Sequence, residues 1–205
     1  MTITINGNGT VTGVSVGGLP DGIVDNDTIA NTTIAEGKLA AGVNAITNVD
    51  QWYVTADWVG STSTTTITAN WARSSVGSSG DLYEKIGTGM TESSGIFTFP
   101  ATGIWLILSQ LMGYDNATSN YASCMIFGTS DSFSSSDVLL NNAKNNIQRT
   151  SGNVYAGIFG AAIFDCKNTS TYKVRMAANS EDSIVWQGHA DRMDTGATFI
   201  RLGAT

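Results

Sequence analysis

Few side chains in this sequence are arranged for catalysis. His189 is the single histidine of the 205 residues, and no serine or cysteine stands in a recognisable triad with it. We expect it to make an ordinary hydrogen bond in a loop. The acidic pairs Glu181–Asp182 and Asp191…Asp194 raise the hypothesis of a glycosidase, which needs two carboxylates at a set separation. Neither context predicts such placement, so we expect no catalytic residues and no enzyme.

A metal site is suggested at one place, where Asp21, Asp25 and Asp27 follow one another closely. Calcium prefers several oxygen ligands held near each other, which these carboxylates would supply. The segment lacks the glycine and the terminal glutamate of a calcium loop. Turn formation and helix capping are therefore the favoured roles, and we expect neither a metal nor a cofactor.

The two cysteines, Cys124 and Cys166, are expected to be buried free thiols, with a disulfide as the less favoured alternative. Each shares a strand face with apolar residues. The amino terminus lacks the basic and apolar regions of a secretory signal. We therefore expect synthesis and assembly in a cytoplasm, where thiols stay reduced.

Composition and charge disfavour several classes of partner. The net charge is −7, and the ten lysines and arginines are scattered singly, which disfavours binding to a nucleic-acid backbone. No apolar run is long enough to predict a membrane span. Hydrophobic residues make up 41% of the chain, so we expect a packed domain rather than a disordered one.

Alternating apolar residues separated by turn residues predict an all-β sandwich over residues 48–205. Two polar segments, 128–136 and 141–153, are predicted as loops that carry recognition. The expected strands are 52–58, 64–71, 82–86, 95–99, 104–112, 121–127, 154–166, 172–177, 184–187 and 198–202.

The run Ile104–Leu108 is apolar on both faces, because Ile104, Leu106 and Leu108 alternate with Trp105 and Ile107. A strand of this kind must be covered on both sides. We expect the opposing sheet to cover one face and a neighbouring subunit to cover the other.

Residues 1–47 contain no aromatic residue and no cysteine, so they cannot build a core of their own. Segments 2–5 and 10–11 predict two short strands around a Gly/Asn turn. Thr33 and Glu36 form a capping-box pattern that predicts a short helix near 33–41. We interpret this region as an attachment or stalk arm, with a structureless tail as the alternative. Its candidate anchoring residues are Ile3, Ile5, Ile29, Ile34 and Leu39.

The motif Gly95-x-Phe97-x-Phe99-Pro100-x-x-Gly103-x-Trp105 resembles the central signature of the tumour-necrosis-factor and complement globular-head superfamily. That signature reads Gly-x-Phe-x-x-Pro-x-x-Gly-x-Tyr/Trp, and residues 195–203 resemble the closing strand of the same family. The resemblance covers residues 50–205. It implies a ten-stranded jelly roll that forms homotrimers.

Residues 2–22, followed by Asp25-x-Asp27-x-Ile29 and Lys38-Leu39-Ala40, resemble the N-terminal arm of bacteriophage virion fibre proteins. Together the two resemblances imply a trimeric fibre or spike head on a phage virion that attaches to a host surface. Capsid decoration is the alternative, and a glycan-cleaving spike enzyme is the third hypothesis. The arm would bind another virion structural protein.

Candidate residues for these roles follow from the same reasoning. The aromatic residues of the inner sheet are the candidates for the trimer interface, namely Tyr53, Trp105 and Phe199. Recognition of a host glycan or protein requires exposed aromatic and amide side chains in loops. The candidates for that role are Tyr114, Asn116, Asn142, Asn145, Trp186 and His189.

Overall fold

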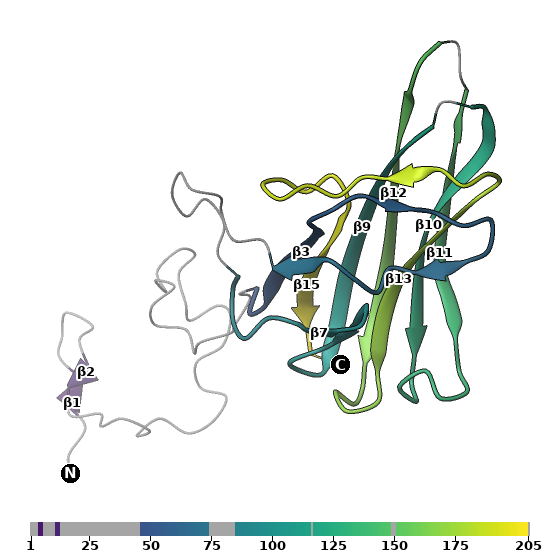
Figure 1. Cartoon of the computed structure of the whole chain (residues 1–205). Helices are drawn as coiled ribbons and strands as arrows, with labels where there is room; N and C mark the ends of the chain where they lie inside the picture. The colour runs from purple at the N-terminus through teal and green to yellow at the C-terminus, as the bar shows by residue number, and fades with distance from the viewer. Residues whose placement is uncertain are drawn as a thin grey trace. The chain divides into compact units, whose positions relative to one another are not determined.

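A computed structural model describes residues 4–5, 11–12, 46–73, 85–115, 117–148 and 151–204. The chain divides into two units, Met1–Ala45 and Ile46–Thr205, and the second is called the head below. All regular elements of the described residues are β-strands, which confirms the predicted all-β class (Figure 1). The strands are β1 (Thr4–Ile5), β2 (Val11–Thr12), β3 (Val49–Val54), β4 (Trp58–Val59), β5 (Thr65–Thr66), β6 (Trp71–Arg73), β7 (Thr91–Ser93), β8 (Ile96–Thr98), β9 (Gly103–Asp115), β10 (Ser119–Thr129), β11 (Val138–Ile147), β12 (Val154–Cys166), β13 (Lys173–Ser180), β14 (Val185–Trp186) and β15 (Gly196–Gly203).

In the first unit, β1 and β2 pair in antiparallel fashion, with Thr4 opposite Thr12 and Ile5 opposite Val11. The predicted pairing of two short strands is confirmed. The helix predicted near 33–41 lies outside the described residues. So do four of the five candidate anchoring residues, Ile3, Ile29, Ile34 and Leu39.

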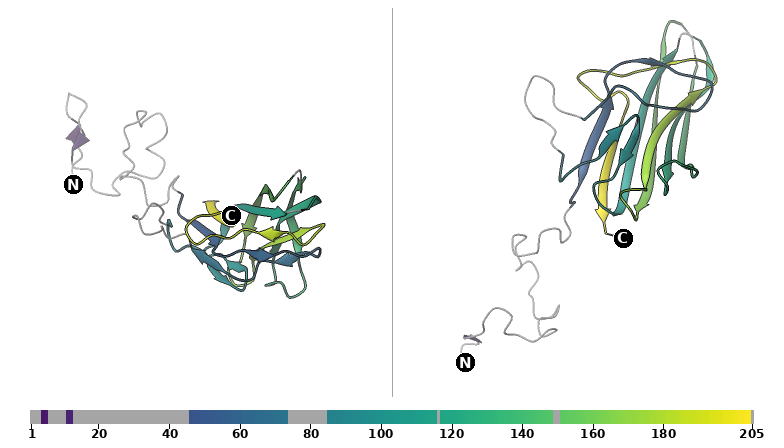
Figure 2. Two further views of the ribbon diagram at one scale, coloured as in Figure 1. Left: turned by 45° about the horizontal axis from the view of Figure 1, so that its top comes forward. Right: turned by 60° about the horizontal axis from the view of Figure 1, so that its bottom comes forward.

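The head consists of two antiparallel sheets in a jelly-roll arrangement. One sheet has the order β11-β10-β13-β8-β7, with β5 also paired to β13. The other has the order β4-β14-β9-β15-β3-β6, with β12 paired along the whole of β9. Figure 2 shows the sandwich from two further directions, with β15 beside β3. The Cys124 thiol on β10 lies 3.4 Å from the Ser109 hydroxyl on β9 and bridges the sheets.

The two glycines of the signature motif stand where the backbone needs a conformation that other residues rarely adopt. Gly95 has φ of 80° and Gly103 has φ of 136°. A Cβ atom on Gly95 would lie 2.2 Å from the carbonyl oxygen of Ile67. A Cβ atom on Gly103 would lie 2.3 Å from that of Gly203. The motif glycines therefore allow close backbone packing on both sides of the aromatic strand.

The aromatic residues of the motif form the centre of the core. The centroid of the Phe97 ring lies 5.0 Å from that of Phe199 and 5.0 Å from that of Trp71. The planes of the Phe97 and Trp71 rings make an angle of 88°. Phe99 lies 5.1 Å from Trp105. Such edge and tilted ring contacts add to the stability that burial of apolar area provides. The motif thus joins both sheets.

The single strand predicted over residues 64–71 is wrong, because this segment forms two short strands, β5 and β6. Between them Asn70 takes a left-handed conformation with φ of 63°. The indole Nε1 of Trp71 donates to the carbonyl of Ile67 over 2.7 Å and closes the turn. Tertiary contacts therefore override the threonine-rich β propensity of the segment.

The polar loop predicted over residues 141–153 is also wrong in its first half, which belongs to β11. Its backbone pairs with β10, for example with Ala143 opposite Cys124. Asparagine disfavours strands on average, but a full ladder to a neighbouring strand outweighs that preference. The strand predicted over 52–58 ends at Val54 instead.

Candidate functional site

The residues predicted to form a trimer interface are covered by their own subunit, so this assignment is wrong. Trp105 and Phe199 are fully buried between the two sheets. Tyr53 is 7% exposed, and its hydroxyl donates to the carbonyl of Ala190 over 2.8 Å, beneath the segment that follows β14. The alternation on each strand predicts two faces. Trp105 and Phe199 take the inner face, where the opposing sheet buries their apolar area.

Part of the opposite face of the same sheet, on β12, β9 and β15, remains uncovered within the head. On β9, Ile104, Leu106 and Leu108 are half-exposed, while Trp105 and Ile107 point inward and are fully buried. This alternation confirms that the run is apolar on both faces and that the opposing sheet covers one of them. Seven apolar side chains define what we call the outer face: Ile104, Leu106, Leu108, Tyr155, Phe159, Ile163 and Ile200.

The outer face is continuous across three neighbouring strands. Leu106 on β9 lies opposite Ile163 on β12 and opposite Ile200 on β15. On β12, Tyr155, Phe159 and Ile163 are 56%, 59% and 58% exposed. None of the seven residues is charged, and a large exposed apolar patch of this kind marks an interaction surface.

A hollow lies beside the protruding ring of Phe159. It has a volume of about 160 Å³, and its lining includes Gln110, Met112, Gly157 and Asp194. A Cβ atom on Gly157 would meet no atom within 4 Å. The outer face therefore places a projecting aromatic ring next to a depression, which are complementary features for contact with another copy.

Two of the predicted receptor-facing residues, Tyr114 and Trp186, lie on the paired strands β9 and β14, but Trp186 is not exposed. Trp186 on β14 is fully buried and stacks on Trp58 at 6.1 Å, so its assignment to a receptor-facing loop is wrong. Tyr114 at the end of β9 is half-exposed, 5.2 Å from the ring of Tyr155. The Nδ1 atom of His189 accepts a hydrogen bond from the backbone of the second residue after it, over 3.0 Å. The ordinary hydrogen bond predicted for His189 is confirmed.

The predicted asparagines lie elsewhere in the head. Asn142 and Asn145 are exposed on β11, at the edge of the six-stranded sheet. The side chain of Asn145 donates to the carbonyl of Gly157 on β12 over 3.1 Å and so links the edges of the two sheets. Asn116 lies outside the described residues. The six predicted residues therefore do not form one site.

The ionisable groups show structural roles. Both cysteines are buried and free, as predicted. Burial raises the pKa of the Cys124 thiol to about 11 and also raises that of Cys166, so neither is a reactive thiolate at neutral pH. Hydrogen bonds from the backbone and side chain of Asn120 lower the pKa of Glu181.

Within the described part of the chain, no group of three or more histidine, cysteine, aspartate or glutamate side chains could hold a metal ion. The residues of the suggested calcium site, Asp21, Asp25 and Asp27, lie outside that part. Among the same described residues, none forms a helix with the length and hydropathy that a membrane crossing requires.

Comparisons with known proteins identify the fold. No protein-family model and no curated protein sequence matches the chain. Murine APRIL at pH 5.0 superposes with a TM-score of 0.54 at 13% identity, over 76% of this chain and 98% of that one. The head has a TNF-like jelly-roll fold. Eiger TNF from S. frugiperda superposes with a TM-score of 0.56 at 12% identity, over 78% of this chain and 96% of that one. At this level of identity the similarity concerns the fold alone.

Proposed function

We propose that the chain is a homotrimeric surface protein of a bacteriophage virion, assembled in the host cytoplasm, whose heads attach the particle to a host surface. Three observations support this proposal. The head has a TNF-like fold, its seven-stranded sheet carries an uncovered apolar outer face, and the sequence of the arm resembles phage fibre arms. The outer face is the observation that carries the proposal.

A second and a third copy of this chain are the occupants that best fit the outer face. The chain has a net charge of −7, so copies repel each other unless they meet through an uncharged surface. The seven side chains of the outer face carry no charge, and a projecting ring stands there beside a hollow whose lining includes the single charged residue Asp194. Complete burial of one side chain such as Phe159 contributes about 1.5–3 kcal/mol, so several such side chains sustain a stable assembly.

Two substitutions test the association, each aimed at one of these features. Phe159→Asp replaces the projecting ring by a carboxylate that is costly to bury. Gly157→Leu adds a bulky side chain at the hollow, at a position where its Cβ atom meets no atom within 4 Å. Light scattering coupled to gel filtration is expected to show a trimer for the native chain and monomers for both variants. The control, Leu139→Asp, introduces the same charge at a 45% exposed leucine of the other sheet.

The outcome for the control is part of the test. Leu139→Asp is expected to remain a trimer, because its residue lies on β11 and outside the outer face. Trimers that persist in both outer-face variants would contradict the assignment of the interface. A native chain that is monomeric at micromolar concentration would contradict the trimer itself.

The position of this protein on the virion separates a role in host attachment from a role in capsid decoration. Gold-labelled antibody against the head, viewed on purified virions by electron microscopy, is expected to cluster at the tail. Label spread in many copies over the capsid would support decoration, in which the trimer clamps neighbouring capsid subunits. Unlabelled particles would contradict both virion roles.

We propose attachment without catalysis. Two of the four carboxylates considered for glycoside cleavage have structural partners: Glu181 accepts from Asn120 over 2.6 Å and 2.8 Å, and Asp194 pairs with Arg192 at 2.9 Å. Incubation of purified protein with host surface glycans is expected to release no shorter saccharides. Cleavage products would instead support the enzymatic hypothesis.

A further inference from the structure

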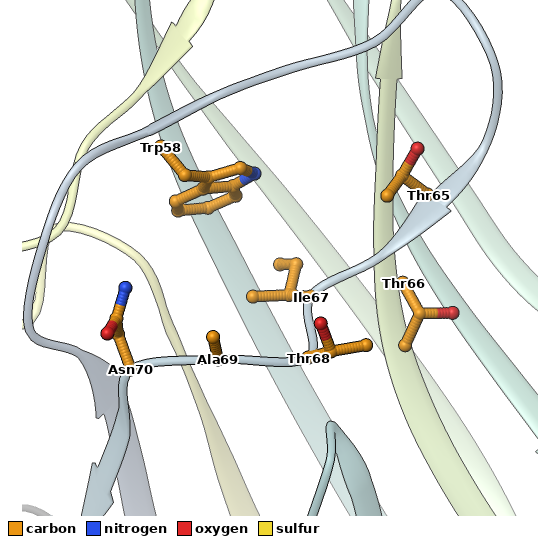
Figure 3. Close-up of a pocket in the computed structure, with 7 residues that line it drawn as sticks. All are labelled: Trp58, Thr65, Thr66, Ile67, Thr68, Ala69 and Asn70. Carbon is orange, nitrogen blue, oxygen red and sulfur yellow. The ribbon is translucent and has the colours of Figure 1, made fainter.

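A small pocket opens on the head, within one continuous segment of the chain. Figure 3 shows this segment leaving Trp58, crossing to Thr65 and Thr66, and returning through Thr68 and Ala69 to Asn70. The pocket has a volume of about 200 Å³. This is smaller than the range typical of drug-sized ligands, so it suits a single small ring.

One wall of the pocket is an aromatic platform. Trp58 is half-exposed, and one face of its indole stacks on the buried ring of Trp186 at 6.1 Å with an angle of 22°. Its remaining face and edge are therefore available to the pocket, together with the nearly buried side chain of Ile67. Because Trp186 already fixes the orientation of this indole, Trp58 loses little conformational entropy when a ligand binds to it.

The rest of the lining is uncharged and combines the apolar side chain of Ala69 with threonine and asparagine side chains. The hydroxyl of Thr65 donates to the carbonyl of Ser63 over 3.1 Å and keeps lone pairs free to accept. The hydroxyl of Thr66 points away from Trp58 and accepts from Arg175 over 2.6 Å, so it faces the other side of the strand (Figure 3). Among the described residues, no hydrogen bond engages the side-chain amide of Asn70, which offers both a donor and an acceptor.

Hydrogen bonds outside the pocket hold this lining in place. The backbone carbonyl of Asn70 accepts from the backbone N–H of Thr55 over 2.9 Å and from its hydroxyl over 3.1 Å. The backbone of Ile67 donates to the carbonyl of Met176 over 3.0 Å, so the segment is tied to β13. A lining fixed on a β scaffold is preorganised for binding.

We propose that this pocket binds one ring of a neutral saccharide, and that it is the receptor-binding site of the head. The inference rests on the attachment role proposed above and names its ligand class. The C–H face of a sugar ring packs against the negative face of an indole, and its hydroxyls require the donors and acceptors that Thr65 and Asn70 supply.

The same features disfavour other ligands and disfavour cleavage. None of the seven lining residues is charged, so the lining provides no charged partner for a phosphate, a carboxylate or an ammonium group. None carries a carboxylate either, and glycoside hydrolysis requires two of them. Peptides are usually recognised along sheet edges or extended grooves, whereas this pocket is compact and bounded by one segment.

A single ring in a small pocket binds weakly, and assembly compensates for that weakness. Millimolar affinity is the scale expected for one such contact. Three pockets on a trimer, and several trimers on a particle, raise the apparent affinity by about 10²–10⁴ when they engage one surface together. The pocket and the outer face therefore contribute to attachment in different ways.

The test uses the full-length protein and four probes: the methyl glycosides of glucose, galactose, mannose and N-acetylglucosamine. Saturation-transfer NMR and tryptophan fluorescence are expected to detect at least one of them with a millimolar dissociation constant. Trp58→Ala is expected to weaken that binding at least about tenfold, while Trp58→Phe retains part of it. Asn70→Gly, which preserves the left-handed backbone, is expected to weaken it severalfold.

Tyr121→Ala serves as the matched control, because this half-exposed aromatic ring lies on β10 and contacts Lys144 at 4.8 Å instead. The control is expected to bind like the native protein. Thermal unfolding shows whether each variant is folded. Absence of binding for all four glycosides overturns the inference, as does native binding by both Trp58→Ala and Asn70→Gly.

Adsorption of virions to host cells, with and without antibody to the head, separates the proposed attachment role from the proposed saccharide ligand. Blocked adsorption without glycoside binding retains the attachment role and overturns the saccharide ligand. Glycoside binding that depends on Trp58, with adsorption unaffected, retains the pocket and overturns the attachment role. Binding to a host protein in the absence of any glycoside binding also overturns the saccharide inference.

Discussion

Asp50 shows at the scale of one residue how the head tolerates a buried charge. Its carboxylate is fully buried and accepts from Arg73 at 2.9 Å, from the Trp52 indole at 2.9 Å and from the Met90 backbone at 2.7 Å. The guanidinium of Arg73 also lies over the Trp52 ring at 4.7 Å. This network ties β3 and β6 to the segment that precedes β7.

Asp50→Ala is expected to lower the free energy of unfolding by about 3–5 kcal/mol, because it leaves buried donors without their acceptor. The midpoint of urea unfolding at fixed protein concentration measures the change. Asp182→Ala, at an exposed carboxylate after β13, is the control and is expected to change stability by less than about 0.5 kcal/mol. Equal midpoints for the two variants would refute a stabilising role for the network.

The ionisation of Asp131 is expected to make the loop between β10 and β11 sensitive to acid. Hydrogen bonds from the Thr129 hydroxyl at 2.6 Å and from Ser135 and Ser136 hold its pKa well below the usual range. The ionised form thus stabilises the loop above the unfolded-state pKa of about 3.9, and this contribution is lost as pH falls further. Amide NMR shifts of Ser135 and Ser136 are expected to move below about pH 4 and to lose this dependence in Asp131→Asn.

At the scale of elements, β9 determines most of the architecture. It pairs with β12 along 13 positions on one side and with β15 and β14 on the other. Its inner side chains build the core, and its outer side chains belong to the outer face. One strand therefore contributes both to folding and to the proposed assembly.

The glycine at the start of β9 gives a prediction for this element. Gly103→Ala is expected to cost about 1–3 kcal/mol of stability, because a Cβ atom would require a strained φ and would lie 2.3 Å from the carbonyl oxygen of Gly203. Gly203→Ala, where a Cβ atom has no neighbour within 4 Å, is the matched control. Chemical denaturation of both variants measures the difference, and a similar effect of both would contradict the strain argument.

At the scale of the whole molecule, the division of the chain at Ala45 separates two proposed tasks. The buried hydrophobic core identified in the described residues lies entirely between Val54 and Phe199. The head therefore has what it needs to fold by itself, while the proposed link to the virion belongs to the arm.

A chain of residues 46–205 is expected to remain folded and trimeric and to lose incorporation into virions. Calorimetry and light scattering test the first two properties, and gold labelling of particles assembled with the shortened chain tests the third. A monomeric or aggregated head would show instead that the arm drives assembly. Particles that still carry the shortened chain would contradict an anchoring role for the arm.

The sequence alone determined the all-β class, the free buried cysteines, the β1–β2 pairing and the two-faced character of residues 104–108. These features depend on local signals, namely the period-two alternation, the turn residues and the glycine and aromatic spacing of the signature motif. The same motif predicted the TNF-like fold, because its glycines and rings meet strict steric demands in the core.

The tertiary structure alone decided which face of β9 points inward, and therefore that Leu106 and Phe159 rather than Trp105 lie on the surface. A period-two pattern defines two faces but does not say which one the opposing sheet covers. The tertiary structure also decided that the asparagine-rich segment pairs as β11, and that Trp58 and Asn70 line one pocket. Those outcomes depend on contacts between segments distant in the chain, or on the path of the chain between them, which local patterns do not encode.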